Sequence, residues 1–244
     1  MKPVYIVSWL FALAISFVSC DDWLDKTPKD RLYPDVYFKT EDELRLFTNQ
    51  FYNNLVPSAV DIYSESSDLI VKSDLMLEMS GQRIIPDEGN GWNFTALRDI
   101  NFYLQYSHNC TEVNARNRYD GVARFFRAYF YFEKVKRYGD IPWYDKALDS
   151  DDPELYKARD SREFVMQKML EDLDFAIANL PKTKNAYVLT RWTALALKSR
   201  VCLFEGTFRK YHGLEDCEKY LNACVSASET FMNESGYTLY KSGS

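Results

Sequence analysis

The chain has 244 residues, of which 46% are hydrophobic and 16% aromatic, so it can bury a substantial core and is not an intrinsically disordered chain. Its 18 Tyr, 16 Phe and 5 Trp outnumber 9 Gly and 8 Pro, a composition that favours helices packed through aromatic side chains over a turn-rich β protein. The net charge of −6, with no long cluster of Lys or Arg, argues against nucleic acid as a partner because phosphates require concentrated positive charge.

The N-terminus has the pattern of an export signal. Lys2 precedes an apolar run at positions 4–18, and these fifteen residues are fewer than the roughly 20 that a membrane-spanning helix requires. A positive charge, a short apolar region and small residues at its end are typical of a secretory signal peptide, whereas a buried N-terminal helix would show an amphipathic period. The run stops at Cys20, which is a candidate for lipid attachment, with a free thiol in a secreted protein as the alternative.

A helix is predicted directly after this N-terminal region. Thr40 followed by Glu43 is a capping-box pattern, in which each side chain satisfies a free backbone N–H of the other residue. At positions 57–91 Ser, Asp and Gly interrupt short apolar runs, which predicts mostly loop with a short helix or turn, and long ordered loops often carry function. One face of the predicted helix is apolar and contains Leu44, Phe47, Phe51 and Leu55.

Apolar residues at helical spacing predict five more helices further along the chain. The second of these should end at Gly139, and the third should be capped by Asp160 or Ser161 and closed by Pro181. The one candidate strand is short and covers residues 236–240. The five predicted helices cover residues 97–107, 119–138, 161–180, 190–208 and 214–234.

The order of these helices predicts a fold. Helices rich in Ala and Leu, such as the one at 190–208, allow neighbouring helix axes to approach closely, which is the physical basis of tetratricopeptide-like stacking. The regular repeat of about 34 residues that defines that motif does not occur here. The sequence therefore predicts an all-α fold of irregular tetratricopeptide-like helix hairpins with long loops.

The cysteines and histidines form no recognised metal or disulfide pattern. Cys217 and Cys224 lie seven residues apart on one predicted helix, which separates them by about 10 Å, too far for a disulfide bond. With only His108 and His212 in the chain, a His-based zinc site has almost no ligands. The cysteines beyond Cys20 are interpreted as thiols of the core.

The acidic pairs and the aromatic run also have a structural explanation. Glu171 and Asp172, and likewise Glu215 and Asp216, are predicted to lie on polar helix faces, where no apolar pocket would raise a pKa for general acid or base catalysis. The aromatic residues at 125–132 point all round a helix, so we assign them to packing and not to a carbohydrate platform. We therefore expect a protein without enzymatic activity, with no catalytic residue, no cofactor and no metal site.

Five stretches spread over nearly the whole chain after the signal carry a distributed, collinear pattern. They are "SCDDWLDKTP" at 19–28, "LRDINFYL" at 97–104, "RFFRAYFYFEKVKRYGDIPW" at 124–143, "VMQKMLEDLDFAIANLP" at 165–181 and "TRWTALALKSRVCLFEGTF" at 190–208. The most specific part is the aromatic helix that contains Arg127, Ala128 and Tyr129 and leads through Gly139 to Pro142. Together these stretches resemble the SusD/RagB family of nutrient-binding outer-membrane lipoproteins found in Bacteroidetes.

The resemblance implies a non-enzymatic, surface-exposed lipoprotein of the cell outer membrane, active in nutrient uptake and polysaccharide utilisation. Such a protein binds a nutrient, in most cases a glycan, and delivers it to a SusC-like TonB-dependent transporter. It further implies a lipoprotein signal peptide at 1–19, lipidation of Cys20, and a lipid anchor and tether at 20–39. Members of the family are about twice as long, so residues 40–244 are expected to form the N-terminal helical domain of an incomplete SusD-like fold. The alternative is a helical protein-interaction module without its own ligand site.

Three residues are candidates for ligand binding. Trp92 and Asn93 lie in the glycine-bearing loop "EGNGWNF", and Arg83 precedes it. Aromatic faces stack on the apolar patches of sugar rings, while amide and guanidinium groups satisfy the hydroxyls. An anchor of the core or of the loop is the alternative role for Trp92.

Overall fold

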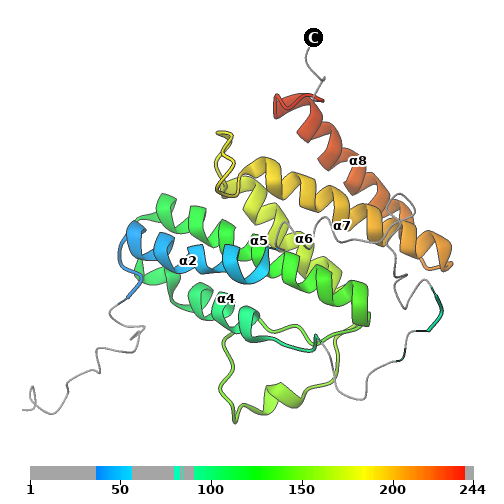
Figure 1. Cartoon of the computed structure of the whole chain (residues 1–244), viewed down its shortest axis with the longest axis horizontal. Helices are drawn as coiled ribbons and strands as arrows, with labels where there is room; N and C mark the ends of the chain where they lie inside the picture. Colours follow the sequence, from blue (N-terminus) through cyan, green and yellow to red (C-terminus); the bar gives the residue numbers. More distant parts are fainter. Residues whose placement is uncertain (1–36, 57–79, 83, 85–90, 240–244) are drawn as a thin grey trace, which may run out of the picture. The chain divides into compact units, whose positions relative to one another are not determined.

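The computed structural model describes residues 37–56, 80–82, 84 and 91–239 (Figure 1). The chain divides into two units, and the first, Met1–Tyr37, lies almost wholly outside the described residues. The predicted signal peptide, the candidate lipidation residue Cys20, the ligand candidate Arg83 and most of the predicted loop at 57–91 also fall outside them. The second unit, Phe38–Ser244, contains every helix described below.

The described part of the chain is all-helical, which confirms the predicted fold class. Within it no strand forms, and Ile141 and Asp160 make one isolated antiparallel bridge. The α-helices are α2 (Glu41–Leu55), α4 (Thr95–Tyr106), α5 (Val113–Tyr138), α6 (Arg162–Asn179), α7 (Arg191–Tyr211) and α8 (Cys217–Glu234). Two short 3-10 helices are η2 (Ser107–Asn109) and η3 (Pro153–Tyr156).

The helix ends are set by the capping groups that the sequence contains. The predicted capping box of α2 is confirmed, because the N–H of Glu43 donates to Thr40 Oγ1 at 3.3 Å and the N–H of Thr40 donates to Glu43 Oε2 at 3.1 Å. Of the two candidate caps for α6, Ser161 is the one used. Gly139, with a φ of 70°, ends α5 as predicted.

Three predicted boundaries or elements are wrong. α5 starts at Val113, before the predicted position 119, because Ala115 already begins the buried face of this helix. α8 starts at Cys217, later than predicted, because Asp216 has a φ of 62° and so cannot be part of the helix. The candidate strand is absent over residues 236–239, where Gly236 has a φ of 64° instead of an extended conformation.

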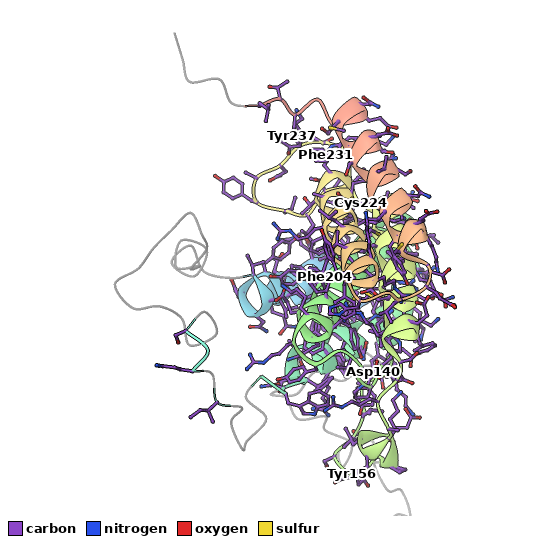
Figure 2. The ribbon with its side chains drawn as sticks, turned by 90° about the vertical axis from the view of Figure 1, so that its right-hand side faces the viewer. Asp140, Tyr156, Phe204, Cys224, Phe231 and Tyr237 are labelled. Atoms are coloured by element: carbon purple, nitrogen blue, oxygen red, sulfur yellow. The ribbon has the colours of Figure 1, made fainter. Side chains whose placement is uncertain are left out.

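The helices pack as neighbours in sequence. α2, α4 and α5 contact one another, and α6 lies against α5 (Figure 1). α7 and α8 make the most extensive contact between two helices of the described chain. At that pair, Gly206 allows close approach, since a Cβ atom there would lie 2.7 Å from the side chain of Leu221. Figure 2 labels Phe231 and Tyr237 beside the end of α8, where their rings stack with centroids 5.6 Å apart.

Aromatic side chains fill the interior of this unit. Most of the aromatic run on α5 is buried, including Phe126, Phe130 and Tyr131, so its assignment to packing agrees with the structure. Phe51 and Tyr103 are also fully buried and meet edge to face, with ring centroids 6.3 Å apart. The thiols are free at the four described cysteines, of which Cys110 and Cys202 are buried and Cys217 and Cys224 half-buried on α8 or at its start.

The prediction that Asp172 lies on a solvated face is wrong. Its side chain is 2% exposed and accepts two hydrogen bonds from Arg127, from Nε at 2.6 Å and from Nη2 at 2.7 Å. The reason is that α6 packs along α5, and Arg127 is itself buried on the facing side of α5. Its neighbour Glu171 does lie on the exposed face, where it pairs with Lys168.

Candidate functional site

An open cavity lies between the start of α4 and the segment 140–160 that links α5 to α6. Its volume is about 610 Å³, within the range of small-molecule binding sites. Figure 2 marks the segment with Asp140, just after α5, and with Tyr156 on η3. The lining residues are Trp92, Phe94, Thr95, Leu97, Arg98, Asn101, Pro142, Tyr144, Lys146, Leu148, Leu155, Lys157, Ala158 and Arg159.

Side chains of α5 and α4 hold this segment in place. The hydroxyl of Tyr131, on α5, accepts a hydrogen bond from the N–H of Tyr144 at 2.6 Å. Asn101, on α4, donates from Nδ2 to the carbonyl oxygens of Tyr144 at 2.8 Å and Lys146 at 3.2 Å. Arg98 Nε donates to the carbonyl of Leu148 at 3.2 Å. The segment has little secondary structure, so these side-chain bonds satisfy backbone groups that would otherwise lack partners.

The buried pair on α5 and α6 supports the same wall of the cavity. Arg127 Nη1 donates to Asn101 Oδ1 at 3.3 Å, while the other nitrogens of the guanidinium bind Asp172. Burial alone lowers the pKa of Arg127, but hydrogen bonding to Asp172 and its charge outweigh burial and raise it, so the guanidinium stays charged. The orientation of the Asn101 amide is thereby fixed, with its NH₂ group directed to the segment 140–160.

Trp92 is anchored by neighbouring rings and also forms part of the cavity wall. Its ring meets Phe94 and Tyr138 edge to face, with centroids 5.2 Å and 4.9 Å away. The guanidinium carbon of Arg159 lies 4.9 Å from the ring centroid, in a cation–π contact. Trp92 remains 37% exposed, so the same side chain can anchor the loop and touch a ligand. Its predicted role in ligand binding stays a prediction.

Asn93 has a local structural role. Its Oδ1 accepts a hydrogen bond from the N–H of Thr95 at 2.8 Å, at the start of α4. Asn93 lines a neighbouring cavity of about 580 Å³ and not the one that Trp92 lines. Ligand binding by Asn93 remains a prediction that now concerns a different cavity.

Several lining residues were not among the residues predicted from sequence. Asn101 had a recognisable signal, since it is a polar residue on the buried face of an amphipathic helix. No sequence signal marked Tyr144 and Arg159, because they lie in a segment with no periodic pattern of apolar residues. Burial raises the pKa of Tyr144, and the charges of Asp160 and Glu154 raise it further, so its hydroxyl remains protonated and donates a hydrogen bond to the carbonyl of Leu155 at 3.3 Å.

The cavity combines aromatic surface with hydroxyl and cationic groups, which suits reversible binding of a polar ring. In the part of the chain that the structure describes, no group of three or more His, Cys, Asp and Glu is placed to hold a metal ion. None of the described helices is long and apolar enough to cross a membrane.

Comparison with known proteins identifies the family. A family model described as "Starch-binding associating with outer membrane" matches residues 51–191, which include the whole lining of the cavity. SusD-like protein P38 of Formosa agariphila is 25% identical over an alignment of 226 residues that covers 84% of this chain and 43% of that protein. This chain thus spans about half the length of the curated relatives it matches.

Solved structures share the fold. A SusD-like protein from Bacteroides fragilis matches with a TM-score of 0.62 and 24% identity, over 88% of this chain and 42% of that one. A laminarin-binding SusD-like protein matches with a TM-score of 0.52 and 17% identity, over 63% and 33% of the two chains. The resemblance predicted from sequence is therefore confirmed, and because the family model covers more than half of the chain, the chain belongs to the SusD-like family.

Proposed function

We propose that the chain is a surface lipoprotein of the outer membrane that binds a glycan and delivers it to a SusC-like TonB-dependent transporter, without chemical conversion of the glycan. The observation that carries the binding role is the cavity of about 610 Å³ with the partly exposed Trp92 in its wall. The printed description of the family as starch-binding, and the laminarin-binding relative, support a carbohydrate as ligand.

The geometry fits a sugar for physical reasons. Pyranose rings present apolar C–H patches that pack on aromatic side chains, and Trp92, Phe94 and Tyr144 supply such surface in one cavity. Sugar hydroxyls need hydrogen-bond partners of both kinds, because a buried polar group without a partner is costly. The hydroxyl oxygen of Tyr144, whose proton is donated to Leu155, can accept such a bond, and the cations of the wall can donate one.

Glycan binding is tested with the full chain on a panel of polysaccharides and oligosaccharides. Trp92→Ala should weaken the best binder by about tenfold or more, because removal of an aromatic contact surface loses on the order of 1–2 kcal/mol. Tyr211→Ala is the matched control, since Tyr211 is 82% exposed at the end of α7 and does not line the cavity. Failure of every saccharide to bind would reject the binding role, and release of reducing ends from a bound glycan would reject a non-enzymatic one.

Membrane location and transporter delivery are tested in cells. Cys20→Ala should abolish incorporation of a radiolabelled fatty acid and shift the protein from the membrane to the soluble fraction, while Cys110→Ala should change neither. A tagged full chain should co-purify with a TonB-dependent transporter. Capture of the transporter by a chain that binds no glycan would favour the alternative, a helical protein-interaction module.

A further inference from the structure

The wall of the candidate cavity carries an excess of positive side chains. Four cationic residues line it, and none of the described lining residues is Asp or Glu. A neutral sugar requires hydrogen-bond donors and acceptors, but it does not require four cations around it. The cations of the lining are Arg98, Lys146, Lys157 and Arg159.

The two lysines have carboxylate partners outside the lining. Lys146 Nζ lies 2.9 Å from Glu154 and 3.7 Å from Asp152. Lys157 Nζ lies 2.9 Å from Asp160 and also donates to the carbonyl of Trp143 at 2.6 Å. The positive charge of each lysine is therefore largely compensated by a carboxylate.

The positive charges of the two arginines are less compensated by nearby carboxylates. Arg98 is 63% exposed, and its nearest carboxylate, on Asp149, is 3.9 Å away. Arg159 is exposed, and among the described residues no carboxylate lies within ion-pair distance of it. Its contacts are the ring of Trp92, at 4.9 Å, and the carbonyl oxygen of Asp140, at 3.5 Å.

These contacts prepare Arg159 to bind an anion. The cation–π contact with Trp92 restricts the side chain, so less conformational entropy is lost when a ligand binds. A guanidinium presents N–H groups in a fork that matches the two oxygens of a carboxylate or sulfate. Among the described residues, no carboxylate pairs with Arg159 and would compete with the anion for its guanidinium.

We propose that the cavity selects an acidic saccharide, whose carboxylate or sulfate group pairs with Arg159 while its ring packs beside Trp92. This inference rests on the proposed glycan-binding function and names the chemical class of its ligand. Arg98, on α4, supplies a second positive charge to the same cavity.

The test uses pairs of saccharides that share one backbone and differ in whether the acidic group is charged or is masked or removed. One pair is an oligogalacturonide and its methyl ester, and the other is a sulfated galactan oligosaccharide and its desulfated form. The full chain should bind the acidic member of at least one pair about tenfold more tightly, the scale of one charge-assisted hydrogen bond at a partly exposed site. The preference should shrink at high salt, since salt screens exposed charges. Which of the two pairs shows the preference tells whether the cavity selects a carboxylate or a sulfate group.

Variants of Arg159 assign the preference to this residue. Arg159→Gln should remove the preference and leave binding of the neutral member intact, and Arg159→Lys should restore part of the preference because it restores the charge. Both variants should fold, since the side chain is exposed. Arg45→Gln is the control, because it changes the net charge equally at a residue of α2 that pairs with Asp42 and does not line the cavity.

The outcomes separate this inference from the function on which it rests. Equal binding of the acidic and neutral members in both pairs would overturn the inference and leave glycan binding in place. A preference that survives Arg159→Gln would overturn the assignment to Arg159. If no saccharide binds at all, the proposed function fails and the inference fails with it.

Discussion

The buried ion pair between α5 and α6 gives the sharpest test of how this fold is held together. Asp172 is 2% exposed and Arg127 is 9% exposed, and two hydrogen bonds of 2.6 and 2.7 Å join them. Asp172→Asn keeps the shape of the side chain but removes its charge, so the guanidinium of Arg127 is left buried without a counterion. The outer cation Arg124, whose Nη1 is 3.7 Å from Asp172, loses its partner as well.

The expected loss of stability is large for a substitution that replaces one carboxylate oxygen by an NH₂ group. Removal of one partner from a buried ion pair costs about 3–5 kcal/mol, because the remaining charge has been taken out of water without compensation. For a chain of this size, 1 kcal/mol lowers Tm by about 2–4 °C, so Asp172→Asn should lower Tm by roughly 6–20 °C. Urea denaturation followed by circular dichroism gives the free energy of unfolding directly.

The neighbouring residue supplies a matched control. Glu171 has the same kind of charge on the same helix, but its side chain is 49% exposed and pairs with Lys168 at the surface. Glu171→Gln should therefore cost less than about 1 kcal/mol. If Asp172→Asn cost no more than Glu171→Gln, the idea that the pair is buried and coupled would be refuted.

A double variant separates the pair from its parts. Arg127→Met combined with Asp172→Leu replaces both charges by apolar groups, and such replacements of buried ion pairs are often close to neutral. The double variant should thus be more stable than the sum of the two single losses predicts. Additive losses would show that the two side chains do not stabilise the fold as a unit.

Two further predictions concern the remaining helix contacts. Burial alone would raise the pKa of Glu163, but the charges of Arg209 and Lys219 outweigh it and hold the pKa below its ordinary value of 4.5. The carboxylate therefore stabilises the fold above about pH 4.5, and this contribution is lost as pH falls through the lowered pKa. Glu163→Gln should lower Tm at pH 7 by the equivalent of about 1 kcal/mol, discounted for partial exposure, and the difference from the wild type should close in acid; a difference independent of pH would contradict this. Gly206→Ala should destabilise by about 1–3 kcal/mol, because its Cβ would lie 2.7 Å from the Leu221 side chain and 3.1 Å from the Leu221 backbone nitrogen. Gly121→Ala, whose nearest contact would be 3.4 Å, should instead stabilise by up to about 1 kcal/mol through helix propensity, so a Tm shift of the same sign in both variants would be evidence against the described packing.

The parts of the fold that were predicted from sequence are those encoded by local patterns. The capping box at Thr40 and the glycine with positive φ that ends α5 at Gly139 act within a few residues, and the structure contains both. The period of apolar residues likewise placed the helices, because burial of one face is the main source of helix stability in a protein.

The parts that were missed depend on contacts between distant residues. The period of apolar residues places Asp172 on the polar side of α6, and only the position of Arg127 on the facing helix makes that side an interior one. The cavity was missed for the same reason. Its wall at Tyr144 and Arg159 belongs to a segment held by side chains of α4 and α5, more than forty residues away in the case of Asn101 and Tyr144. Trp92 was found because an aromatic residue in a glycine-bearing loop is a local signal.

The central claim is that this chain binds a glycan in the cavity beside Trp92. Isothermal titration of the best-binding saccharide from the panel into the full chain, with Trp92→Ala and Tyr211→Ala titrated alongside, tests it most directly. The proposed function predicts saturable binding by the wild type and by Tyr211→Ala, with affinity at least about tenfold lower in Trp92→Ala. Unchanged affinity in a folded Trp92→Ala variant would show that the glycan binds elsewhere and would contradict the claim.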